Sequence, residues 1–302
     1  MGRGFLYMTQ SALAFAAMGA LAKAAGRRLP VAEVVLARAL VSLALSLVAL
    51  RRAGVSPIGR RPARLFARGA VGALGLACVF YAVTALPLAE ATMIQYLHPV
   101  FTAALAALVL RERTGAGLAL SIAFGAAGVA AVARPAALFG GAAAAPLPAL
   151  GLAAALAGAF LSACAYVAVR HLSATEHPVV IVFWFAWVAV AGSLPFALHD
   201  FVWPRGAEWL LLAAVGVAAQ AGQVAMTQGL RLEPAARATA LSYLQVVFAA
   251  ALGALFFGER PTVWTALGGG AILCGTLVAL RDARRAAGAA RVAPAARPAG
   301  EA

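Results

Sequence analysis

One arginine, Arg38, lies inside a long apolar stretch and has the clearest potential for binding chemistry in this sequence. The stretch begins near residue 31, so Arg38 lies roughly 10 Å along a helix that rises 1.5 Å per residue. A guanidinium in hydrocarbon costs about 2.5–3.5 kcal/mol on insertion scales and therefore needs a partner or a water-filled cavity. Two interpretations stay open. Arg38 binds a carboxylate or phosphate of a substrate, or it forms an internal ion pair that fixes helix packing.

Amide, hydroxyl and imidazole side chains recur at helical spacing in three other apolar stretches. Such groups are typical of a small-molecule cavity, in which a few polar atoms interrupt an apolar wall. The alternative is hydrogen bonding between helices, which contributes on average only about 0.6 kcal/mol per pair. We predict that the two tyrosines and Gln223 line a cavity. The full set of candidates is Gln95, Tyr96, His98, Gln223, Tyr243 and Gln245.

Glu90 and His98 are the titratable candidates for coupling to protons. Glu90 lies about one turn into its apolar stretch, where burial would raise its pKa. An acid near a helix N-terminus also has a purely structural explanation, because it compensates the helix dipole. We leave both interpretations open for Glu90.

Five further residues are interpreted mainly as structural. Lys23 and Glu33 flank one short loop, which predicts an interface ion pair, with a gate as the alternative. Pro99 lies in the middle of an apolar stretch, where it removes a helix hydrogen bond and predicts a bend. Glu112 and Glu259 each end an apolar stretch and are each followed by arginine, so we expect them to form end-anchoring pairs.

The composition identifies the elements that must position these residues. Of 302 residues, 64% are hydrophobic and 11% charged, whereas soluble domains average about 45–50% and ~25%. A helix that spans a membrane needs ~20 apolar residues. We predict an all-α polytopic membrane protein with ten transmembrane helices. The apolar runs cover about residues 4–22, 31–50, 65–86, 88–110, 115–133, 149–169, 179–198, 208–229, 235–257 and 263–280.

The net charge of +14 is explained by orientation in the membrane and does not indicate a nucleic-acid partner. With a cytoplasmic N-terminus, 17 basic residues flank the inner ends of the spans and six flank the outer ends. Such a bias is the positive-inside signal. It predicts that both termini are cytoplasmic. The inner count includes Arg68, which we place among the flanking arginines.

An internal repeat is the strongest signal in the chain. Residues 87–113 and 234–260 align without a gap at an offset of 147 residues, and 15 of 27 positions are identical. Each half then contains five spans. Because five is odd, the second half must enter the membrane in the opposite orientation, as in the inverted repeats of many secondary transporters.

These boundaries divide the chain into four parts. We expect a first five-helix repeat at 1–134, a linker loop at 135–148, a second repeat at 149–281 and a disordered basic tail at 282–302. Three cysteines without paired spacing predict neither a disulfide framework nor a metal site.

The ten-span plan and several local motifs resemble the EamA family of the drug/metabolite transporter superfamily. The motifs are the paired ends Arg111-Glu112-Arg113 and Gly258-Glu259-Arg260, Lys23 closing the first span, Glu33 with Arg38 in the second span, and the segment 86–92. The resemblance covers about residues 5–281. It implies a carrier of amino acids, amines, vitamins or related organic solutes.

We therefore expect a secondary active transporter in the plasma membrane that moves a small metabolite by alternating access. The chain has no nucleotide-binding loop, so we predict no cofactor and a proton or substrate gradient as the energy source. The expected partners are a small-molecule substrate, membrane lipid and protons. The alternatives are a membrane-embedded enzyme, for which no catalytic motif is present in the sequence, and an accessory membrane subunit without transport activity.

Overall fold

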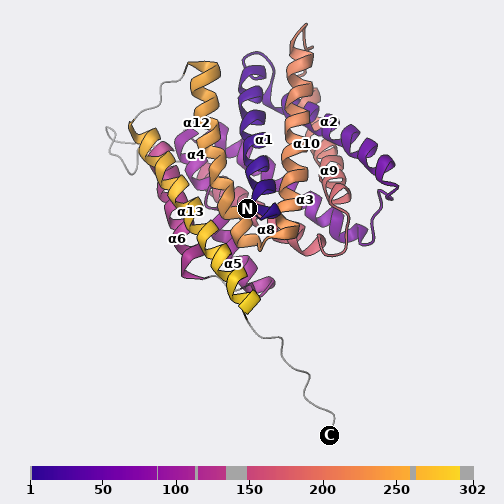
Figure 1. Cartoon of the computed structure of the whole chain (residues 1–302). Coiled ribbons are helices and arrows are strands. Elements are labelled where there is room, and N and C mark those ends of the chain that lie inside the picture. The colour runs from indigo at the N-terminus through magenta and orange to yellow at the C-terminus, as the bar shows by residue number, and fades with distance from the viewer. Residues whose placement is uncertain (1, 87, 113–114, 134–147, 259–262, 293–302) are drawn as a thin grey trace.

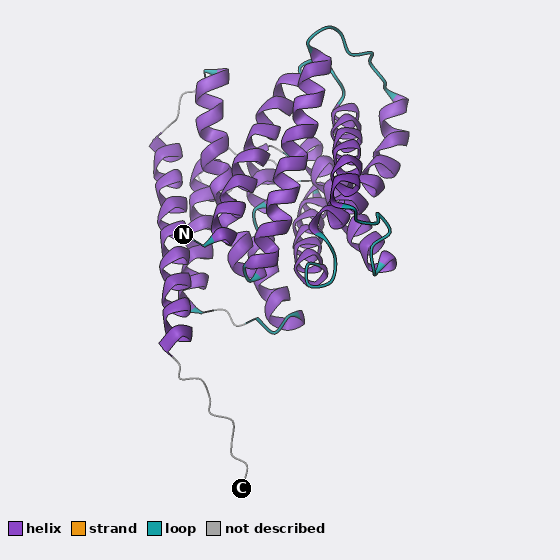
Figure 2. Cartoon of the chain, turned by 45° about the vertical axis from the view of Figure 1, so that its right-hand side comes forward, coloured by secondary structure: helices purple, strands orange, loops and turns teal. Residues whose placement is uncertain are grey.

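The computed structural model is a bundle of helices (Figures 1 and 2) and describes all residues except 1, 87, 113–114, 134–147, 259–262 and 293–302. No strand occurs among the described residues. The first half contains α1 (Arg3–Ala25), α2 (Val31–Ala53), α3 (Pro62–Ala85), α4 (Leu88–Gln95), α5 (His98–Val109) and α6 (Ala116–Ala133). The second half contains α8 (Ala149–Leu172), α9 (Pro178–His199), α10 (Glu208–Leu232), α11 (Ala235–Ala240), the 3₁₀ turn η1 (Leu241–Tyr243), α12 (Leu244–Phe257) and α13 (Val263–Val292).

The helices account for the ten predicted spans. Within the described ranges, seven helical segments are long and apolar enough to cross a membrane, and three shorter apolar helices complete the set. The chain is an all-α polytopic membrane protein built from two inverted five-helix repeats. Helix ends follow local chemistry. For example, α2 ends with Arg51 and Arg52, which favour the negative end of the helix dipole, before Gly54 turns the backbone into the left-handed region at φ 63°.

The two repeats interlock rather than pack as separate halves. Helix α1 packs against α10, and α3 packs against α8. The offset of 147 residues relates these two pairings to each other, because it carries α1 onto α8 and α3 onto α10. The equivalent helices α2 and α9 also contact each other, as do α6 and α13, which lie side by side at one edge of Figure 1. A pseudo-twofold axis therefore runs through the middle of the bundle.

The fourth and ninth spans are broken at equivalent positions. The fourth divides into α4 and α5 around Tyr96 and Leu97, and the ninth divides into α11, η1 and α12 around Tyr243. Pro99 lies in the first turn of α5, where a residue without an N–H is tolerated, so it is compatible with a break in the fourth span. The residue equivalent to Pro99 is Val246, which can donate a helix hydrogen bond. Proline therefore cannot be the common cause of the two breaks.

The helix α13 is longer than the sequence suggested. It continues to Val292, into the stretch that we expected to be a disordered tail from residue 282. The linker at 135–147 and the last ten residues lie outside the described part of the chain.

Candidate functional site

A central cavity of about 260 Å³ lies between the two repeats. It is lined by α1 to α5 of the first repeat and by α8, α9, α10 and α12 of the second. Six of the predicted residues belong to the wall, namely Arg38, Gln95, Tyr96, His98, Gln223 and Gln245. The predicted residue Tyr243 is 1% exposed and packs behind this wall. Glu90 is in α4, and its side chain is outside the described part of the structure.

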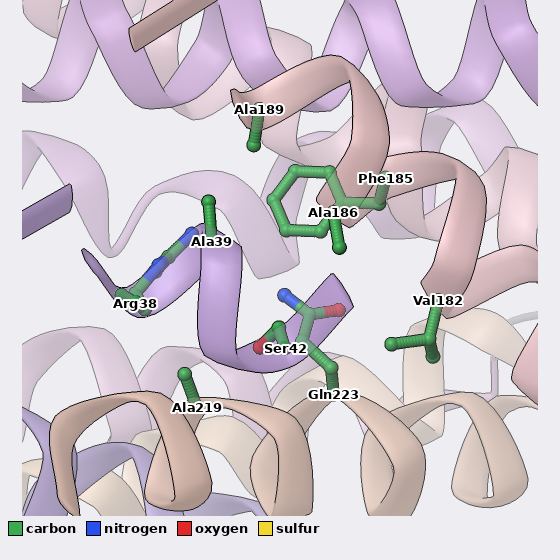
Figure 3. Close-up of a pocket in the computed structure, with 9 residues that line it drawn as sticks. All are labelled: Arg38, Ala39, Ser42, Val182, Phe185, Ala186, Ala189, Ala219 and Gln223. Carbon is green, nitrogen blue, oxygen red and sulfur yellow. The ribbon is translucent and has the colours of Figure 1, made fainter. Parts of the chain in front are cut away.

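Arg38 reaches the cavity from α2. Figure 3 shows its side chain with Ser42, Phe185 and Gln223 at a small pocket that shares Arg38, Phe185 and Gln223 with the central cavity. Its Nη1 contacts Met18 Sδ at 3.7 Å, a weak acceptor, and its Cζ lies 5.9 Å from the ring centroid of Phe185. The structure therefore gives this guanidinium no carboxylate partner among the described residues.

Arg68 of α3 also lines the cavity, which corrects its assignment to the cytoplasmic flank. It is 3% exposed, and its Cζ lies 4.5 Å from the centroid of the Phe185 ring. Its Nη2 is 3.5 Å from Gln223 Oε1, while Nε and Nη1 have no hydrogen-bond partner in the described chain. The prediction was wrong because Arg68 follows the helix start at Pro62 by six residues, which carries its side chain into the bundle.

The carboxylates whose side chains the structure describes bind groups outside the cavity. None of those whose side chains the structure describes lines the cavity. Each contacts an arginine, a histidine or a backbone N–H at the ends of the bundle. The set is Glu33, Glu112, Glu176, Asp200, Glu208 and Glu233.

The remaining polar wall is only partly hydrogen-bonded. Gln95 Nε2 donates to Ser162 Oγ at 3.2 Å, but Gln95 Oε1 is buried without a partner in the described residues. The His98 ring lies 5.1 Å from the ring of Tyr166, and its Nε2 is 3.5 Å from Ser242 Oγ. His98 Nδ1 is likewise buried without a described partner. Buried polar atoms of this kind are available to a ligand, because leaving them unpaired is unfavourable.

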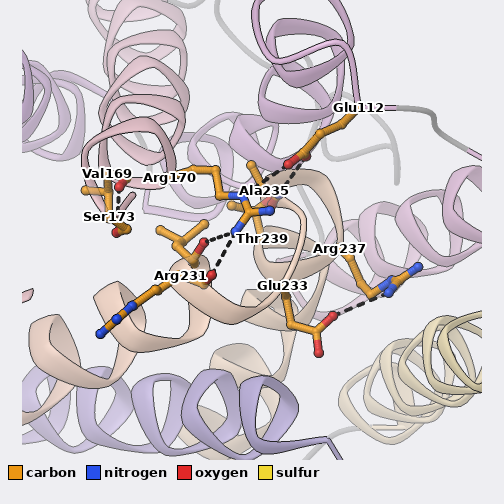
Figure 4. Close-up of polar contacts among 10 residues, drawn as sticks. Glu112, Val169, Arg170, Ser173, Arg231, Glu233, Ala235, Arg237 and Thr239 are labelled. Atoms are coloured by element: carbon orange, nitrogen blue, oxygen red, sulfur yellow. Dashed lines mark hydrogen bonds and ion pairs between the residues drawn. The ribbon is translucent and has the colours of Figure 1, made fainter. Parts of the chain in front are cut away.

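One end of the bundle is closed by contacts between the repeats, which we call the end cluster (Figure 4). Arg170 Nε donates to Glu112 Oε1 at 3.1 Å, and its Nη1 donates to the carbonyls of Leu230 and Arg231. Glu112 Oε2 accepts from Ala235 N at 2.8 Å. The end cluster therefore links the ends of α5, α8, α10 and α11. We expected Glu112 to pair with Arg113, which lies outside the described residues.

The end cluster lies one helical turn beyond the central cavity. On α8, Tyr166 lines the central cavity, and Arg170 lines a separate cavity of about 340 Å³ together with Glu112 and Arg231. The contacts of Arg170 therefore lie at the wall of this second cavity, one turn along α8 from the central one.

The opposite end does not show the predicted pair of Lys23 with Glu33. Glu33 Oε2 accepts from Val202 N at 3.1 Å, and Lys23 Nζ lies 4.8 Å from the ring centroid of Phe257. Arg28 forms an ion pair with Glu208, which raises the pKa of Arg28. The connection from α1 to α2 is thereby tied to the connection from α9 to α10. The last predicted end residue, Glu259, lies outside the described part of the chain.

Several wall residues were not among the sequence candidates, and four of them have contacts described above, namely Arg68, Ser162, Tyr166 and Phe185. Arg68 carries a detectable signal, because it lies inside the run 65–86 rather than before it. Phe185 is the repeat equivalent of Arg38, so the offset of 147 residues could have placed it opposite that arginine. We find no comparable signal for Ser162 or Tyr166.

Two interlocked inverted repeats around a polar cavity are a construction typical of membrane transporters. Residues 2–134 and 149–281 each match the EamA-like transporter family, and the chain belongs to that family. It is a family of transporters and not of enzymes.

Individual relatives agree with this assignment. The "Pseudopaline exporter CntI" of Pseudomonas aeruginosa is 34% identical over 267 residues, which cover 88% of this chain and 92% of that protein. "Solute carrier family 35 member G1" of Homo sapiens is 28% identical over 225 residues, 71% of this chain and 61% of the human protein. One crystal structure superposes with a TM-score of 0.82 at 25% identity and covers 94% of this chain and 98% of its own.

Proposed function

We propose that this protein is a secondary active exporter of a small polar metabolite across the plasma membrane. The observation that carries the proposal is the central cavity, whose wall combines polar side chains from both inverted repeats. The relative named as an exporter supports the direction. Transport of a metabolite rather than an inorganic ion suits a wall that mixes aromatic rings with amides and guanidinium groups.

The end cluster suggests how access to the cavity alternates. Arg170 and Glu112 contact groups of both repeats one turn beyond the cavity. Rocking of one repeat against the other would separate these groups and open the central cavity toward this end of the bundle. In the proposed cycle, the end cluster is intact in the outward-facing form and broken in the inward-facing form.

The orientation follows from the basic residues. Removing Arg68 from the inner flank leaves 16 basic residues inside against six outside, so the bias is unchanged in direction. Both termini are then cytoplasmic, and the end cluster lies at the cytoplasmic end. A reporter fused to the C-terminus tests this topology, and an extracellular reporter would contradict it.

We propose protons as the coupling ion, with Glu90 and His98 as the groups that bind them. His98 is buried in the cavity wall, where protonation would respond to substrate binding. An imposed pH gradient across vesicles should accelerate substrate flux, and replacement of the responsible group should abolish that acceleration without abolishing exchange.

Reconstitution tests the function directly. Purified protein in proteoliposomes should exchange an internal radiolabelled metabolite with the same external metabolite faster than empty vesicles do. Amino acids, amines, vitamins and organic acids form the test panel, and Arg38→Ala is the site variant. If no member of the panel exchanges above the empty-vesicle rate, the proposal fails.

A further inference from the structure

We propose that the substrate is an organic anion with two carboxylate groups, one bound by Arg38 and the other by Arg68. This inference rests on the proposed function and names the substrate class of the same cavity. Neither the family match nor the relatives' names assign these two arginines to a ligand.

The described wall of the cavity is positively charged. Arg38 and Arg68 bring two positive charges to one cavity, and no described carboxylate lines it. Arg68 is 3% exposed, yet its Nε and Nη1 have no partner in the described chain. Unpaired donors on a buried guanidinium are unfavourable, and a carboxylate matches these donors in a bidentate arrangement. Arg38 is only partly buried and contacts the weak acceptor Met18 Sδ, so it offers a second position for a carboxylate of the substrate.

Both arginines lie close to one aromatic ring. The guanidinium carbons of Arg38 and Arg68 lie 5.9 Å and 4.5 Å from the centroid of the same Phe185 ring. The two guanidinium carbons are therefore no more than about 10 Å apart. The side chains come from two different helices, α2 and α3. A molecule with one anionic group for each guanidinium can bind both across this short span.

The rest of the cavity wall offers amide and aromatic contacts to the middle of the substrate. Gln223 lies near both arginines and supplies an amide, while Tyr166 and Phe185 supply aromatic surface. The cavity of about 260 Å³ is near the lower end of the range for small-molecule sites, ~300–1,000 Å³. A short chain between two carboxylates fits this combination of size, polar ends and apolar middle.

A matched series of five-carbon ligands tests the substrate class. Thermal unfolding of the full chain is followed in detergent and chloride-free buffer with glutarate, pentanoate or 1,5-diaminopentane. Glutarate should raise the unfolding temperature at concentrations at least tenfold below those needed for pentanoate, and the diamine should have no effect. Equal effects of glutarate and pentanoate, or stabilisation by the diamine alone, would overturn the proposal.

Two variants locate the effect. Arg38→Gln and Arg68→Gln should each reduce the apparent affinity for glutarate at least tenfold, to the level of pentanoate. If Arg68→Gln does not fold, Arg38→Gln carries the same comparison. Unchanged glutarate affinity in the variants would show that the dicarboxylate binds elsewhere and would overturn the assignment.

Glu90 is the competing acid, because its side chain is outside the described part of the structure. If Arg68 has no counter-ion, Arg68→Met should raise the unfolding temperature of the ligand-free protein, and Glu90→Gln should leave it unchanged. If Glu90 neutralises Arg68, each single replacement should lower that temperature, and the effects should not add. The second pattern contradicts the proposal.

Flux measurements separate this inference from the transport function. If the diamine is exchanged and glutarate is not, the protein is still a transporter, but the proposed anion site is wrong. Glutarate binding without flux of any solute in the panel would overturn the transport function and leave the anion site supported.

Discussion

Tyr96 and Tyr243 occupy equivalent positions in the two repeats and stack on each other, with ring centroids 5.9 Å apart and ring planes inclined by 25°. The hydroxyl of Tyr243 also donates to the backbone carbonyl oxygen of Tyr96 at 3.1 Å. Both residues lie where their spans are broken. The contact therefore joins the two breaks across the pseudo-twofold axis, next to the central cavity.

The Tyr243 hydroxyl should contribute to stability through this one hydrogen bond. Tyr243→Phe is expected to lower the free energy of unfolding by about 1 kcal/mol, because a neutral hydrogen bond is lost while the ring contact stays. Thermal unfolding of the purified protein measures the effect. Tyr96→Phe is the matched control, since only the backbone of Tyr96 takes part in this bond. An equal loss in both variants would contradict the assignment.

The position of Tyr243 should depend on Gly125 of α6. A Cβ built at Gly125 would lie 2.1 Å from Tyr243 Cδ2, so a side chain cannot fit unless the tyrosine ring moves. Gly125→Ala is expected to destabilise the protein by about 1–3 kcal/mol through overpacking. Gly269→Ala in α13 is the control, because nothing lies within 4 Å of a Cβ there. Stability that falls equally in both variants would show that helix glycines matter generally and that the Tyr243 contact does not.

Pro99 should be dispensable for the break in its span. The equivalent break around Tyr243 forms with Val246 at the matching position. Pro99→Ala is therefore expected to fold and to keep an exchange rate within about threefold of the original protein, less than 1 kcal/mol in activation free energy. Proteoliposome exchange measures this rate. Loss of transport in a folded Pro99→Ala protein would show that the proline itself is needed.

The sequence predicts the spans and the repeat well because both depend on regular patterns. Runs of ~20 apolar residues follow from the thickness of the membrane, and the matched segments at 87–113 and 234–260 survive as identical residues. Arg38 stood out because no surface explanation fits a charge so far inside a run, and substrate binding and an internal ion pair were both left open. The structure places it in the wall of the central cavity.

Long-range partners could not be predicted in this way. Glu112 and Arg170 are 58 positions apart and lie in different repeats, so no local spacing relates them. Arg68 shows a second limit. A charge near the end of an apolar run has two physical explanations, membrane orientation and burial, and only the packing of α3 against α8 and α9 decides between them.

The central claim is that the cavity opens to one side of the membrane at a time. Ser162 lines the central cavity, so Ser162→Cys in a background without Cys78, Cys164 and Cys274 gives a reporter within it. A membrane-impermeant maleimide added to oriented vesicles then measures access from each side separately. Glu112→Gln weakens the ion pair with Arg170 while retaining an acceptor for Ala235 N, so it should favour the inward-facing form.

The proposed cycle predicts that Ser162→Cys alone is labelled from the outside. Adding Glu112→Gln should raise the labelling rate from the cytoplasmic side about fivefold, equivalent to about 1 kcal/mol, and lower the rate from the outside. Rates that rise together on both sides would indicate a continuous pore and contradict alternating access, as would a cysteine that is labelled from neither side.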